Sequence, residues 1–153
     1  MIYIYLSTCK WSLASSLIRY GTRCKYSHAG FYDTETKTYL SAQLNGGVQI
    51  RTTDGKGIHK EKFTRISFFT APGIEKAYAY AKTLVGSKYD WKAILGIATD
   101  QNWHVRDNYF CSEDVAYSFE QTGNPIINSS ANMWVVTPRD IPLSLLVTEV
   151  KAI

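Results

Sequence analysis

Cys111 and His28 are the residues of this sequence best suited to act together in a chemical step. Cys111 lies in the first turn of a predicted helix, directly after the apolar pair Tyr109-Phe110. The unpaired N–H groups and positive dipole end at such a position favour a thiolate and can stabilise an oxyanion beside the sulfur. His28 falls in a predicted strand beside the small residues Ala29 and Gly30, where a substrate backbone can approach. This pairing predicts a thiol nucleophile with an imidazole base.

A third polar group on the following strand can orient the imidazole. The period-two alternation of a strand separates its side chains into two sets. One predicted face carries Tyr39, Ser41 and Gln43, and the core-facing side carries Leu40, Ala42 and Leu44. Either Ser41 or Gln43 is therefore expected to face His28, and the alternation alone does not choose between them.

The other cysteines and histidines have simpler interpretations. Cys9 lies between a strand and a helix start and is the rival nucleophile, whereas Cys24 is a loop thiol between Arg23 and Lys25. His59 is expected on the surface, and His104 in a loop. Because the three histidines are scattered without a nearby carboxylate pattern, we expect no metal site and no cofactor. A buried structural cysteine is the alternative role for Cys111 itself.

The composition describes an ordinary globular chain. With 153 residues, 45% of them hydrophobic, a single domain over residues 1–153 is expected. The net charge of +4 comes without a basic run, so nucleic-acid binding is not predicted. No apolar stretch has the length of a membrane span or an export signal. Three cysteines without a C-x-x-C spacing favour a reducing compartment, so we expect a cytoplasmic protein, in the host cytoplasm if a virus encodes it. No oligomeric state is predicted.

Hydrophobic periodicity predicts an α+β fold in which a mainly antiparallel sheet packs against helices. The predicted strands are Ile2–Leu6, Tyr26–Tyr32, Thr38–Leu44, Val48–Thr52, Arg65–Thr70 and Met133–Thr137. The predicted helices are one after Thr8 that buries Trp11, Ala14, Leu17 and Ile18, one from Pro72 to Val85, and one from Ser112 to Thr122.

These pieces, in this order, resemble the circularly permuted NlpC-type papain-like cysteine hydrolases. The resemblance rests on a series of stretches that spans nearly the whole chain: Leu17-Ile18-Arg19, Tyr26-Ser27-His28-Ala29-Gly30, Ser41-Ala42 with Gly46-Gly47-Val48, Gly86-Ser87-Lys88-Tyr89-Asp90-Trp91, Tyr109-Phe110-Cys111-Ser112-Glu113 and Thr137-Pro138-Arg139-Asp140.

The resemblance implies a permuted papain-like domain and a role for each matching residue. Cys111 matches the nucleophile and His28 the general base, while Tyr89 matches an active-site tyrosine that can assist the oxyanion. Many relatives carry an acid or a histidine where this chain has Ser41, so Gln43 is expected to support Ser41 or to contact substrate.

The implied activity is attack on an amide or ester carbonyl through an acyl-enzyme. The expected substrates are a peptide, a peptidoglycan-like amide or a lipid ester. Two alternatives stay open: a non-catalytic binding domain that uses the same cleft, and a lipid acyltransferase or thioesterase. If His28 and the helix dipole both act on Cys111, the pKa of its thiol is expected to lie well below the free value of about 8.5.

Overall fold

The computed structural model describes residues 1–9, 13–52, 63–90, 92, 108–128 and 136–151. Its strands are β1 (Ile2–Cys9), β2 (His28–Asp33), β3 (Thr38–Gln43), β4 (Gly47–Thr52), β5 (Phe63–Thr70), β6 (Lys88–Tyr89), β7 (Asn108–Tyr109) and β8 (Thr148–Val150). The helices are α1 (Leu13–Thr22), α2 (Ile74–Thr83), α4 (Cys111–Gln121) and the short 3-10 helix η2 (Ile141–Leu143). The fold is α+β, as predicted.

Six strands form one sheet in the order β4-β3-β2-β1-β5-β8, and every neighbouring pair is antiparallel. The pairing of β1 with β2 runs from Ile2 opposite Asp33 to Ser7 opposite His28. This register places the first residue of β2 beside the end of β1. Strands β6 and β7 pair in parallel and form a separate two-stranded sheet.

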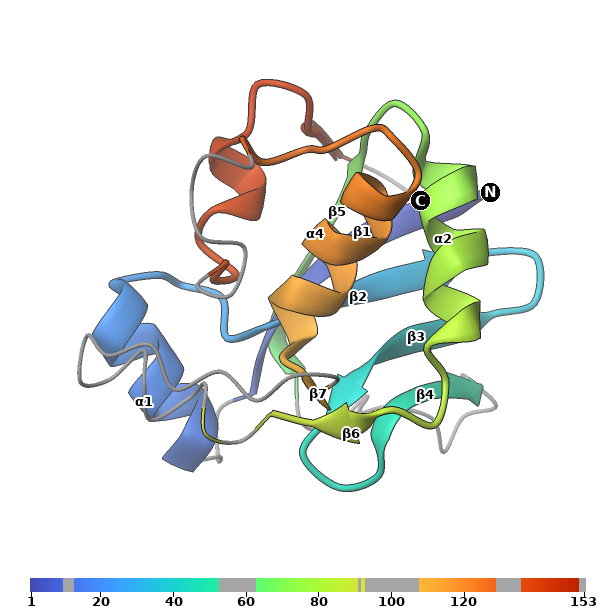
Figure 1. The fold of residues 1–153 in the computed structure, drawn as a ribbon. Helices are drawn as coiled ribbons and strands as arrows, with labels where there is room; N and C mark the ends of the chain where they lie inside the picture. Colours follow the sequence, from blue (N-terminus) through green and yellow to red (C-terminus); the bar gives the residue numbers. More distant parts are fainter. Residues whose placement is uncertain (10–12, 53–62, 91, 93–107, 129–135, 152–153) are drawn as a thin grey trace.

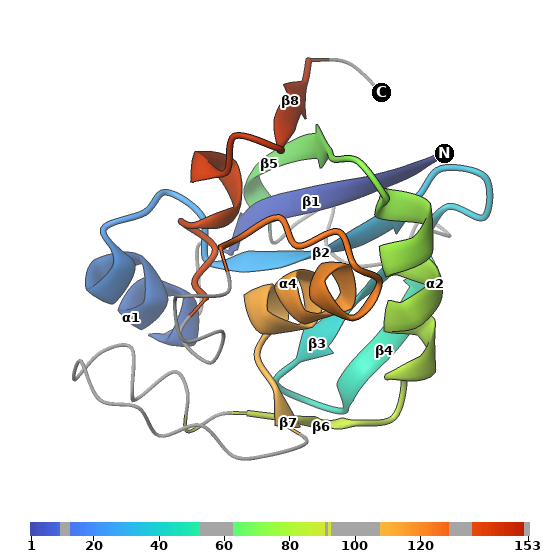
Figure 2. The same ribbon diagram turned by 45° about the horizontal axis from the view of Figure 1, so that its top comes forward.

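Helices α2 and α4 lie side by side over one face of the sheet (Figures 1 and 2). Each buries an apolar stripe at helical spacing against the strands, which is the usual source of stability for a surface helix. Phe31 of β2 packs between the two helices, with its ring centroid 6.1 Å from that of Phe119 and 5.9 Å from that of Tyr78. In both views α4 stands between α2 and α1, which lies to one side (Figures 1 and 2).

The turn between β3 and β4 brings β4 against the chain that follows α2. Gly47 has a φ of 68°, in the left-handed region that favours glycine. A Cβ there would lie 1.9 Å from the carbonyl oxygen of Ser87. Val48 donates its N–H to that same oxygen at 2.9 Å, so the glycine permits a close backbone contact that anchors the start of β6.

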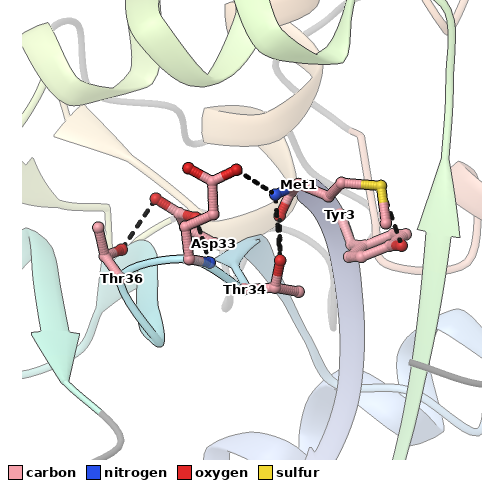
Figure 3. A network of polar contacts seen from close by, with 6 residues as sticks. Met1, Tyr3, Asp33, Thr34 and Thr36 are labelled. Atoms are coloured by element: carbon pink, nitrogen blue, oxygen red, sulfur yellow. Dashed lines mark hydrogen bonds and ion pairs between the residues drawn. The ribbon is translucent and has the colours of Figure 1, made fainter.

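The start of β1 is fixed to the turn between β2 and β3 (Figure 3). The Met1 amine donates to Thr34 Oγ1 at 3.1 Å and to Glu35 Oε1 at 3.3 Å. Within the turn, Asp33 accepts hydrogen bonds from the Glu35 N–H and from the Thr36 hydroxyl. These contacts hold β1 and β2 in register at the end of the strands far from His28.

Several predicted details of the elements are wrong. Leu44 and Leu17 are not core residues: Leu44 is 56% exposed beyond the end of β3, and Leu17 is 44% exposed on α1. Strand β8 was not predicted, because its three residues Thr148–Val150 have no apolar alternation and pair only with β5. Most of the predicted strand Met133–Thr137 lies outside the described residues, and its last two residues, Val136 and Thr137, are not in a strand.

Among the described residues, no helix combines the length and the apolar character that crossing a membrane requires.

Candidate active site

Helix α4 begins at Cys111 and holds the thiol at its N-terminus, as the sequence predicts. Phe110 is the N-cap residue, and its N–H donates to Glu113 Oε2 at 3.0 Å, which satisfies one of the donors that a helix start leaves unpaired. Cys111 itself is fully buried. It packs in a small cluster with Phe110 and Ile18, and Tyr89 lies against this cluster.

The start of α4 faces a place where two strands of the sheet separate. Cross-strand pairs between β2 and β3 run from Asp33–Thr38 to Phe31–Leu40 and stop there, although both strands continue. The backbone N–H of Ala29 lies beyond the last pair and acts on the Cys111 sulfur, and the N–H of Ala42 acts on the Asp114 carboxyl. The N–H groups of Ala29 and Ala42 therefore interact with side chains of α4.

Burial is the dominant influence on the Cys111 thiol. It raises the pKa to about 12, against the lowering effect of the Ala29 and Ser112 N–H groups, and the carboxyls of Glu113 and Asp114 raise it further. The expectation of a lowered thiol pKa is thus wrong for this structure, because loss of hydration outweighs the two backbone donors at the helix start. Near neutral pH the sulfur carries its proton.

This state predicts slow alkylation of Cys111. Because only the thiolate reacts, the rate with iodoacetamide should rise about tenfold for each pH unit between pH 7 and 10. Peptide mass spectrometry measures the rate, and the partly exposed Cys24 of the same sample provides the comparison. A Cys111 rate that levels off near neutral pH would contradict the raised pKa.

His28 is held from the neighbouring strand by both candidate orienting residues. Its Nε2 lies 3.2 Å from Ser41 Oγ and 3.0 Å from the side-chain nitrogen of Gln43. The same Gln43 nitrogen donates to Ser41 Oγ at 2.7 Å. The sequence left Ser41 and Gln43 as alternatives, and the structure brings both to the imidazole.

Tyr5 is the site residue that sequence reasoning missed. Its hydroxyl lies 3.1 Å from His28 Nε2 and 3.0 Å from Ser41 Oγ, and the side chain is fully buried. Tyr5 stands in the apolar run Ile2–Leu6, which predicts only a buried strand. The available signal was the alternation of Tyr3, Tyr5 and Ser7 with Ile2, Ile4 and Leu6, which gives β1 a polar face beside His28.

Tyr89 lies at the end of β6, close to the start of α4. Its ring centroid is 6.1 Å from that of Phe110. Burial raises the pKa of Tyr89 well above its ordinary value, and the nearby groups Cys111, Glu113 and Asp90 raise it further. The phenol therefore keeps its proton and can serve as a hydrogen-bond donor near Cys111.

Two acidic residues follow Cys111, and neither is solvated. Burial raises the pKa of Glu113 to about 8, opposed by the Phe110 N–H and supported by Asp90. Asp114 is fully buried, and neither of its carboxyl oxygens has a well-formed hydrogen bond within the described part of the chain. Burial raises its pKa to about 8 as well, against the lowering effect of the Ala42 N–H. At neutral pH both carboxyls are largely protonated.

The structure describes the other candidate residues only in part. Cys9 ends β1, but its side chain is not among the described groups. Cys24 accepts a hydrogen bond from the Tyr26 N–H at 3.4 Å. His59 and His104 lie outside the described residues. Within the described ranges, no group of three His, Cys, Asp or Glu side chains could hold a metal ion.

The comparisons with known proteins identify the fold rather than a family. No family model matches the chain, and no curated protein matches it significantly. A solved structure, that of the metalloprotein YiiX from Escherichia coli O157:H7, is similar with a TM-score of 0.71 at 17% identity. The alignment covers 100% of this chain and 97% of that one. The chain therefore has the fold of YiiX over its whole length.

Proposed function

We propose that this chain is a cysteine hydrolase with a permuted papain-like fold, in which Cys111 is the nucleophile and His28 the base. One observation carries the proposal: α4 sets Cys111 beside Ala29, the neighbour of a histidine that polar groups of two adjacent strands hold in place. Three polar contacts to one nitrogen of this partly buried imidazole hold the ring in a defined orientation. The order of the motifs along the sequence supports the same class.

The proposed reaction starts from a neutral thiol. As the sulfur attacks the carbonyl carbon of an amide or ester, its proton passes to His28, and a C–S bond forms. The Cys111 N–H and the Tyr89 hydroxyl donate to the oxyanion. His28 then protonates the leaving amine or alcohol as the C–N or C–O bond breaks. Water attacks the acyl-enzyme and restores the thiol, while a different acceptor in that step would make the same chemistry an acyl transfer.

An acyl-enzyme can be tested with p-nitrophenyl acetate, a small activated ester. We expect a rapid release of p-nitrophenol with acetylation of Cys111, located by peptide mass spectrometry after acid quenching. Cys24→Ala provides the matched control, because this partly exposed thiol has no role in the site. Acetylation of Cys24 without Cys111, or equal release by Cys111→Ala, would contradict the proposal.

Ser41→Ala is expected to lower turnover by tenfold or less. The variant removes one neutral hydrogen bond to His28, which contributes about 1 kcal/mol, while Gln43 still contacts the ring. Gln43→Ala should raise KM more than it lowers kcat. Steady-state kinetics of the two variants measures both effects. A Ser41→Ala protein as inactive as Cys111→Ala would show that the hydroxyl does more than orient the imidazole.

A second candidate function, a non-catalytic binding domain, is favoured by the state of Cys111. A fully buried thiol with a pKa of about 12 is typical of a structural cysteine. If this candidate is correct, Cys111→Ser and Cys111→Ala will destabilise the fold, and p-nitrophenyl acetate will leave Cys111 unmodified under conditions that acetylate Cys24.

A further inference from the structure

Helix α1 stands apart from the two helices that cover the sheet (Figures 1 and 2). It carries an exposed apolar stripe of Leu13, Leu17 and Tyr20, which share one side of the helix because they are spaced i, i+4 and i+7. Leu13 is 86% exposed, Tyr20 87% and Leu17 44%. The outer side of a surface helix is normally polar, so this stripe needs an explanation outside the core.

The opposite side of α1 packs on the candidate active site. Ile18 is buried in the cluster with Phe110 and Cys111. Ser15 is also buried and donates its hydroxyl to Ser27 Oγ at 2.6 Å. The core therefore uses one face of α1 and leaves the stripe on the other. A surface bound to the stripe would lie about one helix diameter, roughly 10 Å, from Cys111.

The sequence around α1 has basic residues and no acidic ones. Lys10, Arg19, Arg23 and Lys25 all precede Asp33, which is the first acidic residue of the chain. Because the chain has 17 Lys and Arg residues against 13 Asp and Glu, these four account for the whole net charge of +4. The positive charge and the apolar stripe thus belong to the same part of the molecule.

Three exposed cations gather at the C-terminal end of α1. Arg23 and Lys25 follow the helix directly, and Arg139 approaches from the chain after α4 and donates from Nη1 to the Thr22 carbonyl at 3.5 Å. None of the three forms an ion pair with a carboxylate of the described residues. The helix dipole favours basic residues at this end, but it gives no reason for apolar residues on the exposed side.

We propose that α1 docks the protein onto an anionic membrane surface, with Leu13, Leu17 and Tyr20 inserted among the lipids and the neighbouring cations against the headgroups. Exposed leucines beside basic residues are typical of helices that lie in the bilayer interface, where tyrosine is also favoured. A second copy of the chain fits less well, because it would bring two sets of unpaired cations together. Nucleic acid would contact the cations and leave the leucines in water.

Flotation with phospholipid vesicles tests this docking. Wild type should bind vesicles of equal parts phosphatidylcholine and phosphatidylserine, and should bind pure phosphatidylcholine at least about tenfold more weakly, because each basic residue near an anionic surface contributes a factor of about five in affinity. Raising the salt from about 0.1 M to 1 M, which shortens the Debye length from about 10 Å to 3 Å, should remove most of this preference.

Leu13→Gln combined with Tyr20→Gln should lower the affinity for the mixed vesicles at least about tenfold, because the apolar burial of these side chains is lost. Both positions are largely exposed, so the fold should be retained, and circular dichroism checks this. Leu145→Gln is the matched control. This leucine is fully exposed outside α1, so its substitution should leave the affinity unchanged.

The charges are tested by Arg23→Gln combined with Lys25→Gln. This variant should bind the mixed vesicles about 25-fold more weakly and should bind pure phosphatidylcholine as wild type does. Lys76→Gln combined with Lys88→Gln removes two exposed charges elsewhere, so it controls for the change in net charge and should lose much less affinity.

The inference is overturned if wild type does not float with the mixed vesicles, if Leu145→Gln loses binding while the Leu13 and Tyr20 variant keeps it, or if the Lys76 and Lys88 variant loses as much as the Arg23 and Lys25 variant. A dimer in light scattering that the Leu13 and Tyr20 variant abolishes, or binding of an RNA oligonucleotide without binding of vesicles, would also overturn it.

The docking does not depend on the proposed chemistry of Cys111, although it would bring membrane lipids close to that residue. Vesicle binding by a protein without esterase activity would support this inference and contradict only the proposed function. An active esterase that ignores the mixed vesicles would do the reverse.

Discussion

Cys111→Ala is expected to reduce hydrolysis to the uncatalysed background, and His28→Ala to lower kcat by roughly 10²–10⁴-fold, the range of general base catalysis. The first variant removes the atom that forms the acyl-enzyme. The second leaves a thiol whose pKa of about 12 provides almost no thiolate near neutral pH. Because the thiol depends on a proton acceptor, the His28→Ala rate should recover as the pH rises. Initial rates with p-nitrophenyl acetate between pH 6 and 10 measure both effects.

Two variants control for indirect effects on the fold. Cys24→Ala removes a thiol outside the site, and Tyr3→Phe alters the sheet face that carries Tyr5 without a contact to His28. Both should retain the wild-type rate and pH profile. The catalytic pair would be refuted if His28→Ala lost less than about tenfold at pH 7, because removal of a general base has a larger effect.

Asp114→Asn is expected to stabilise the protein at alkaline pH and to flatten the pH dependence of its unfolding. The pKa of Asp114 is about 8 in the folded state and about 4 in an unfolded chain. The folded state therefore binds the proton more tightly. The stability from this group is fully present below pH 4 and is lost as the pH rises through 8. The loss is on the order of a few kcal/mol, and an amide, which does not ionise, avoids it.

Urea unfolding at pH 4.5 and pH 8.5 measures this difference. Relative to wild type, the free energy of unfolding of the variant should increase between pH 4.5 and pH 8.5. Part of the pH dependence should remain in the variant, because the pKa of Glu113 is also about 8. Glu120→Gln removes a partly exposed carboxyl from the same helix and controls for the loss of charge. Equal slopes for wild type and Asp114→Asn would show that Asp114 is solvated in the folded protein.

Local sequence patterns were sufficient to predict those elements that depend only on neighbouring residues. The helix predicted from Ser112 to Thr122 matches α4, which begins one residue earlier at Cys111. The antiparallel order of β2, β3 and β4 follows from short turns with Asp33 and Gly46. The face of β3 that carries Ser41 and Gln43 follows from alternation. Each of these inferences needs only residues close together in the chain.

The features that sequence reasoning missed depend on contacts between distant residues. The helix start at Cys111 favours a thiolate, but the raised pKa reflects burial by Ile18 and Phe110, which no local pattern reveals. Tyr5 has the residue type of a strand core, and its contact with His28 becomes visible only when β1 is placed beside β2. Asp114 is an expected residue for a first helical turn, and the burial of its carboxyl beside the Ala42 N–H depends on how α4 meets the sheet.

Because the β2–β3 pairing ends early, the two strands that carry the site are not joined by backbone pairing at the site itself. Below Phe31 and Leu40 the sheet divides into two leaves, one ending at His28 and the other carrying Ser41 and Gln43. Because no cross-strand pair joins His28 to β3, the distance between the imidazole and these two side chains depends on how closely the unpaired strand ends lie. Substitutions on β4, which pairs with β3 from Thr38–Thr52 to Gln43–Gly47, would then change the geometry around His28 without contacting the ring.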